Sequence, residues 1–214
     1  MNKGLLLTIT EPASRDEEEF NAWYDTEHLA ERLAIPGFLS ARRWVDAGAA
    51  PGSGRYLATY ELSYPGVLET PDYLAHVGDN FSPWSKRVLG RCVLFRRWAC
   101  EQITPGDAAP ADDAVALFVA IGDVAPAHEA EFNRWYDEEH LPLLASVPGV
   151  LRARRFRASA GTPRYLALYD LADPLAPRRP EWRAANETDW ARRMDALTSD
   201  VEWILRGYRA YGSP

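Results

Sequence analysis

The chain has 214 residues and a formal net charge of −7, with 47% hydrophobic and 26% charged residues. This composition is that of an ordinary water-soluble globular protein, and the length allows one large domain or two of about 100 residues each. Neither half is basic and no basic stripe alternates with aromatic residues, so we expect no nucleic-acid partner. The longest apolar runs are far shorter than the roughly 20 residues of a membrane span, so we expect no membrane partner either.

The two cysteines, Cys92 and Cys100, do not indicate a disulfide. If both lie on one strand, they are about 26 Å apart at about 3.3 Å per residue, which is too far for an S–S bond. The short apolar stretch at the N-terminus has no small-residue cleavage site behind it and fits a buried first strand better than a signal peptide. Both observations favour the cytoplasm.

The first half of the chain begins with an apolar, β-prone segment at 4–10, which predicts a strand. Ser14 and the acidic residues at 16–19 are typical of a helix start. This helix should end at the stop signal Ile35-Pro36-Gly37. The elements expected after it are strands at 38–45 and 55–62, an interrupted helical region at 66–89, and a strand at 91–99.

A segment rich in Pro, Ala and Asp at 101–114 reads as a linker. We therefore expect two domains, at 1–100 and 115–214. After the linker the order of elements repeats, with predicted strands at 115–121, 150–157, 164–171 and 203–211 and predicted helices at 126–145 and about 180–200.

The strongest signal is an internal repeat. FNAWYDTEHL at 20–29 returns as FNRWYDEEHL at 132–141 with eight of ten positions identical, and we call this segment the signature. The period is too long for a solenoid and indicates two copies of one small domain. Each copy reads as βαββαβ, the ferredoxin-like unit, in which two helices cover a four-stranded antiparallel sheet.

A sheet with one face in solvent would have a clearly polar face. The strands RYLATYEL (55–62) and RYLALYDL (164–171) have none. We expect the two sheets to pack face to face within one chain, in an α+β, barrel-like pseudo-dimer. Two independent domains are the alternative.

The signature, the following Pro-Gly, the paired arginines and RYLALY together resemble the dimeric α/β-barrel superfamily, in particular its EthD-like small proteins. Members are usually single ferredoxin-like units that dimerise through their sheets. The resemblance therefore implies a tandem fusion, a monomer with an internal pseudo-dimer, for which a further homodimer stays open. The superfamily includes cofactor-free monooxygenases, muconolactone isomerases, polyketide cyclases and haem-handling enzymes, so it implies the fold more strongly than the function.

The two glutamates of the signature are expected to have positively charged partners. At 100° per residue, Glu27 and Glu139 fall in the middle of the apolar helix face, where an unpaired carboxylate is costly. We expect a structural ion pair with an arginine of the next strand, Arg42 or Arg43 in the first copy and Arg154 or Arg155 in the second, and assign Arg42 and Arg154 to it. Asp25 and Asp137 should face solvent.

The signature histidines are the candidate proton-transfer groups. His28 follows Tyr24, and His140 follows Tyr136, by four residues, which places phenol and imidazole on one helix face. Pro142 should end or kink the signature helix of the second copy, which would place His140 near a helix C-terminus, where the dipole favours the charged ring. The candidate catalytic residues are His28, His140, Tyr24 and Tyr136, and the candidate substrate-binding residues are Arg43, Arg155, Trp23 and Trp135. The alternative is that the histidines only hold the helix end in place.

The sequence has no HxH, CxxC, GxGxxG or GxSxG motif, so we expect no metal and no cofactor. The leading hypothesis is a cofactor-independent enzyme of isomerase, cyclase or monooxygenase type. It would act by proton transfer on a small aromatic or unsaturated-acid metabolite. A non-catalytic small-molecule-binding protein is the second hypothesis. Haem handling through a helix histidine is the third, implied by the resemblance.

Overall fold

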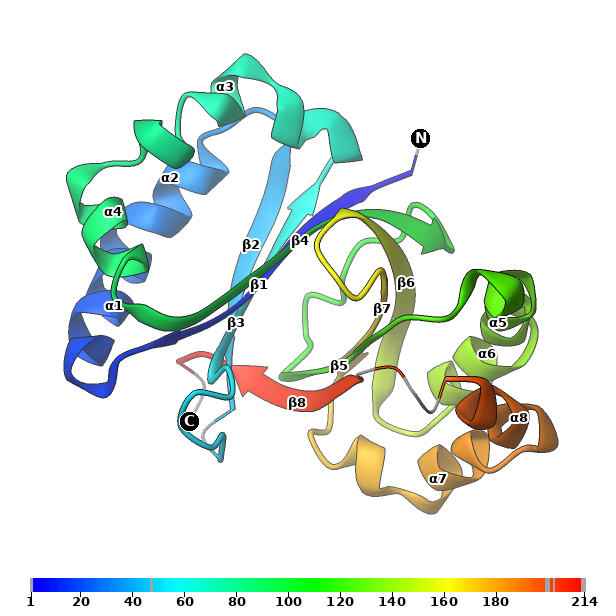
Figure 1. Cartoon of the computed structure of the whole chain (residues 1–214). Helices are drawn as coiled ribbons and strands as arrows, with labels where there is room; N and C mark the ends of the chain where they lie inside the picture. The colour runs from blue at the N-terminus through cyan, green and yellow to red at the C-terminus, as the bar shows by residue number, and fades with distance from the viewer. Residues whose placement is uncertain (1, 47, 199–200, 202, 213–214) are drawn as a thin grey trace. The chain divides into compact units, whose positions relative to one another are not determined.

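The computed structural model describes residues 2–46, 48–198, 201 and 203–212 (Figure 1). The chain forms two compact units, Met1–Glu101 with Ser159–Gly161, and Gln102–Ala158 with Thr162–Pro214. Each is a sheet with helices on one face. Among the described residues, no helix combines the length and the apolar character needed to cross a membrane.

The first unit has an antiparallel sheet in the order β4-β1-β3-β2, so the first strand is central. Its helices α1 to α4 lie along one face of this sheet (Figure 1). The strands are β1 (Gly4–Pro12), β2 (Phe38–Val45), β3 (Tyr56–Leu62) and β4 (Cys92–Thr104), and the helices are α1 (Glu17–Trp23), α2 (Leu29–Leu33), α3 (Pro71–Leu74) and α4 (Pro83–Leu89). Short 3-10 turns occupy Ser14–Asp16, Pro65–Glu69 and Gly78–Asn80.

The second unit repeats this plan, with the strand order β8-β5-β7-β6. The strands are β5 (Ala116–Gly122), β6 (Val150–Ala160), β7 (Tyr165–Leu171) and β8 (Ile204–Ala210), and the helices are α5 (Glu129–Trp135), α6 (Leu141–Ala145), α7 (Pro180–Asn186) and α8 (Asp189–Leu197). Turns of 3-10 helix occupy Pro126–His128 and Ala176–Arg178.

The predicted order of elements is confirmed in both units, with two local differences. β4 continues to Thr104, so the predicted linker begins inside a strand, and its first residue, Glu101, pairs with Gly4 of β1. The helix predicted at about 180–200 is two helices, separated where Thr188 caps α8. The end of that predicted helix, at 199–200, lies outside the described residues.

The signature helix contains a π turn in each unit, at Tyr24–His28 and at Tyr136–His140. A π turn adds a residue to the helical repeat, so every side chain after it is rotated relative to a regular α-helix. A helix end at Pro142 was one of the predictions, and it is wrong. The helix continues past Pro142 as α6 to Ala145. Pro142 lies in the first turn of α6, where a missing backbone N–H is tolerated best.

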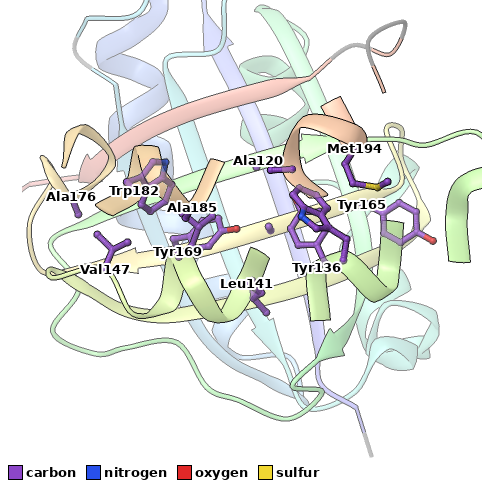
Figure 2. Packing of buried hydrophobic residues seen from close by; sticks show 14 of the residues in the cluster. Ala120, Tyr136, Leu141, Val147, Tyr165, Tyr169, Ala176, Trp182, Ala185 and Met194 are labelled. Carbon is purple, nitrogen blue, oxygen red and sulfur yellow. The ribbon is translucent and has the colours of Figure 1, made fainter. Parts of the chain in front are cut away.

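The core of the second unit lies between the sheet and helices α5 to α8 (Figure 2). Strand β7 contributes Tyr165, Ala167, Tyr169 and Leu171, all buried, because alternate residues of a strand point to one face. Trp182 of α7 and Met194 of α8 pack against them from the helix layer. This layer holds the candidate site.

Candidate functional site

The signature gathers Trp, Tyr and His into one packed group in each unit. The Trp23 and His28 rings stack with centroids 4.2 Å apart, and those of Trp135 and His140 with centroids 4.1 Å apart. Tyr24 meets His28 edge-on at 5.2 Å. Tyr136 meets His140 edge-on at 5.0 Å. The structure thus brings the predicted catalytic pairs into contact twice.

Arg43 and Arg155 point toward the helices, but both are enclosed. The guanidinium of Arg155 lies 4.1 Å from the ring centroid of Tyr136 and donates to Asn133 at 2.9 Å and to Asp137 at 3.4 Å. Arg43 likewise lies 4.4 Å from the Tyr24 ring centroid and donates to Asp25 at 2.7 Å. Asp25 and Asp137 are exposed, as predicted, and are also the partners of these arginines.

The predicted ion pair between the signature glutamates and the strand arginines is wrong. Glu27 accepts hydrogen bonds from Ser82 at 2.6 Å and Ser85 at 3.2 Å, and Glu139 accepts one from Thr188 at 2.6 Å. Ser82 and Thr188 are the N-cap residues of α4 and α8. The π turn rotates each glutamate from the sheet toward the second helix, where it holds the capping hydroxyl in place.

Arg42 and Arg154 lie on the other face of their strands. The guanidinium of Arg154 lies 3.6 Å from the Asp170 carboxylate in a fully buried pair. The guanidinium of Arg42 lies 4.5 Å from the ring centroid of Trp44. Neither contacts the signature glutamates, since alternate strand residues face opposite ways.

Burial keeps both signature histidines neutral. Burial first, and nearby arginines second, lower the pKa of His28 to about 3. Burial also lowers the pKa of His140 to about 4, with a hydrogen bond to Ala185 acting in the opposite direction and Arg155 in the same direction. The prediction that His140 is charged is therefore wrong. His140 lies within the signature helix, which continues to Ala145, and not at its C-terminus. The His140 ring hydrogen-bonds to the backbone of Ala185, and its Nδ1 is buried without a hydrogen-bond partner among the described residues.

A cavity of about 530 Å³ opens in the helix layer of the second unit. Three of the candidate residues line it, namely Trp135, Tyr136 and His140, whereas Arg155 does not. Its aromatic walls are formed by Phe118, Phe132, Trp135, Tyr136, Tyr169, Trp182 and Trp203. A cavity of this size and character suits a small aromatic molecule.

Several polar groups at this cavity are available to a ligand. The Tyr136 hydroxyl, the Asp195 carboxylate and the Arg183 guanidinium line it and form no side-chain hydrogen bond or ion pair with any residue that the structure describes. Burial raises the pKa of Tyr136 to about 12, Arg155 acts in the opposite direction, and the Asp195 carboxylate adds to the rise. Partial burial also raises the pKa of Asp195, which is exposed at the cavity mouth.

Sequence reasoning missed Asp195. Asp195 lies on α8, outside the signature. The second helical regions of the two copies differ too much in sequence to be aligned directly. Aligning the caps Ser82 and Thr188 would have matched Asp195 with Leu89, and so identified a carboxylate peculiar to the second copy.

Among the described residues, no group of three or more His, Cys, Asp or Glu side chains is arranged to hold a metal ion. Cys92 and Cys100 are free thiols. Burial raises the pKa of Cys92 to about 11 and raises that of Cys100 as well, so neither is a reactive thiolate.

Comparison with known proteins gives a fold but no relative by sequence. No family model matches the chain, and no curated protein is similar to it. Among solved structures, a putative monooxygenase from Lactobacillus acidophilus NCFM is 12% identical with a TM-score of 0.60, over 98% of this chain and 94% of that one. An anthrone oxidase-like protein is 11% identical with a TM-score of 0.62, over 98% and 91%.

A mutant chlorite dismutase from Candidatus Nitrospira defluvii is 8% identical with a TM-score of 0.64, over 99% of this chain and 92% of that one. At such identities the likeness shows the fold alone. The chain has the fold of the dimeric α/β-barrel proteins.

Proposed function

We propose that the chain is a monooxygenase-type enzyme that binds a small aromatic substrate in the cavity of the second unit and acts by proton transfer without a cofactor. One observation carries the proposal. The aromatic-walled cavity of about 530 Å³ presents a hydroxyl, on Tyr136, and a carboxylate, on Asp195, without hydrogen-bond partners among the described residues. The names of two similar structures, a putative monooxygenase and an anthrone oxidase-like protein, support the reaction class.

Asp195 takes the role of general base. Its raised pKa brings the carboxylate closer to the working pH, where a base is most effective, while leaving it ionised near neutrality. Tyr136 stays protonated and donates a hydrogen bond to the oxygen on which negative charge develops. His140 is a positioning residue, because its ring fixes Trp135 and Tyr136 while its unpartnered Nδ1 is buried.

The substrate class follows from these groups. An acidic CH2 beside an aryl ring and conjugated to a carbonyl would lose a proton to Asp195, and its electron pair would move to the carbonyl oxygen beside Tyr136. In an oxygenation the resulting carbanion adds O2, and loss of water converts CH2 to C=O. The substrate supplies both electron pairs, so the balance requires only O2. Isomerisation or cyclisation would begin with the same proton transfer.

Haem handling fits this site poorly. The axial ligand would be His140, the one histidine among the described lining residues. Its Nδ1 is buried, and the ring's hydrogen bond to Ala185 engages the other nitrogen. No imidazole nitrogen is therefore presented to an iron in the cavity, and we derive no step through haem.

The test is oxygen consumption with a panel of aromatic CH-acids, with anthrone as the first probe. Asp195→Asn should lower kcat about 10²–10⁴-fold, as expected for loss of a general base, with little change in binding. Tyr136→Phe should lower kcat, and Tyr24→Phe in the first unit should not. Full turnover by Asp195→Asn would refute the mechanism, and probe binding without turnover of any compound would favour a non-catalytic binding protein.

We further propose that the chain is a tandem fusion of two ferredoxin-like units, related to the EthD-like proteins. The repeated strand order and the alignment of similar single chains over nearly the whole sequence support this. A mass in solution near 24.0 kDa, measured by light scattering, would agree with a monomer built in this way.

A further inference from the structure

The two copies differ at the position that lines the cavity. The chain from the signature to the following Pro-Gly aligns without a gap, so that Arg32 in the first copy matches Leu144 in the second. Leu144 is one of the residues that line the cavity. In the first unit the corresponding residue, Arg32, is buried, with 2% of its surface exposed.

Arg32 is held by several contacts. Its Nη2 donates to the backbone carbonyl of His76 at 2.6 Å and to the Glu31 carboxylate at 2.9 Å. Its guanidinium lies 5.6 Å from the ring centroid of Tyr73 and 5.8 Å from that of Phe81. A planar, delocalised group thus lies among aromatic rings and donates hydrogen bonds through its Nη2, whereas its buried Nε has no partner among the described residues.

The counterparts of these contacts surround the cavity in the second unit. Pro71 and Tyr73 open α3 as Pro180 and Trp182 open α7, which matches Tyr73 with the cavity residue Trp182. By the same offset His76 matches Ala185, whose backbone bonds to His140 instead of to an arginine. The second unit therefore keeps an aromatic residue at this wall, and the shorter, uncharged Leu144 stands at the position of Arg32.

We infer that Arg32 is a built-in occupant of the first copy of the site, and that Leu144 leaves the second copy open for one ligand per chain. The inference shares its cavity with the proposed function but concerns binding, not turnover. The charge of Arg32 also adds to burial in lowering the pKa of the neighbouring His28.

The comparison also defines the ligand. Glu31, the anionic partner of Arg32, is replaced by Leu143, and the carbonyl that Arg32 uses is engaged by His140 in the second unit. Among the described residues that line the cavity, Asp195 is the one carboxylate that could compensate a positive charge. The ligand is therefore planar, aromatic and uncharged where it contacts Leu144 and Trp182, and its polar group faces Tyr136 and Asp195.

The experiment is calorimetric titration with 1-naphthol as the probe. Wild type should bind one probe per chain. Leu144→Phe, which fills the cavity without a charge, and the transplanted pair Leu143→Glu with Leu144→Arg should each weaken binding at least 10-fold. Leu144→Met, of similar volume, should bind as wild type does. Arg32→Leu combined with Glu31→Leu should raise the stoichiometry toward two. Near-UV circular dichroism establishes that each variant is folded.

Two or no probes bound by wild type would overturn the inference, and so would unchanged affinity in a folded Leu144→Phe variant. A stoichiometry of one that Leu144→Phe abolishes, in a protein that turns over none of the CH-acids, would uphold the inference while the enzymatic proposal fails.

Discussion

The indole of Trp135 lies against the imidazole of His140, with ring centroids 4.1 Å apart and planes inclined by 25°. This stacking, repeated by Trp23 and His28, places each histidine in an environment that disfavours its charged form. Protonating either ring therefore opposes folding.

This relationship predicts how stability depends on pH. The folded-state pKa of His140 is about 4, below the ordinary value of 6.5, so the unfolded chain binds more protons between these values. The contribution of the neutral His140 ring to the free energy of unfolding is fully present above about pH 6.5. It is lost as the pH falls toward 4, with a slope of at most about 1.4 kcal/mol per pH unit. Chemical denaturation between pH 4.5 and 7.5, in steps of about 0.5, should show a shallower dependence in His140→Gln than in wild type. Equal slopes would mean that the ring titrates normally.

The pH dependence of activity should report Asp195. A general base must be ionised, so kcat/KM should rise with pH through the pKa of Asp195, above its ordinary value of 3.8. The measurement is the initial rate of oxygen consumption across this range at subsaturating substrate. Asp195→Asn should remove the inflection from the residual rate, whereas His140→Gln should retain it. An inflection that persists in Asp195→Asn would assign the titration to another group.

The two copies predict a stabilising substitution. Trp23 Nε1 donates to Ser85 at 3.0 Å, whereas Trp135 Nε1 is buried without a partner among the described residues, because Ala191 occupies the place of the serine. Ala191→Ser should raise the free energy of unfolding by about 0.5–1.5 kcal/mol through a new hydrogen bond. Ser85→Ala should lower it by about 1–3 kcal/mol, since it leaves a buried donor unpaired. Denaturant titration of both variants tests the pair, and destabilisation by Ala191→Ser would show that the indole nitrogen cannot be reached.

The contact of Glu139 with Thr188 predicts energetic coupling between the signature and α8. Thr188→Ala should cost about 1 kcal/mol because it removes the helix cap, and Glu139→Gln should cost about 0.5–1.5 kcal/mol. In a double-mutant cycle, the sum of the two single losses in stability should exceed the loss in the double variant, since both substitutions remove the same contact. Strict additivity would mean that the glutamate does not support the cap.

The sequence predicted the fold well because its signals are local and doubled. Alternating apolar residues and Pro-Gly stops placed the strands, and β2 has the predicted bounds at Phe38–Val45. The signature glutamates were misassigned because a helical wheel at 100° per residue has the wrong phase beyond Trp23, where the π turn begins. The cavity could not be predicted, since it depends on how α7 and α8 pack over the sheet, and on one residue, Leu144, that differs between the copies.

The π turn also has a consequence for how the two units can be compared. The same widened turn lies at matching residues, Tyr24–His28 and Tyr136–His140, so the side chains that follow it are rotated by the same amount in both units. Arg32 and Leu144 therefore follow the same helical geometry and differ in the side chain alone. Each unit can thus serve as the internal reference for a substitution made in the other.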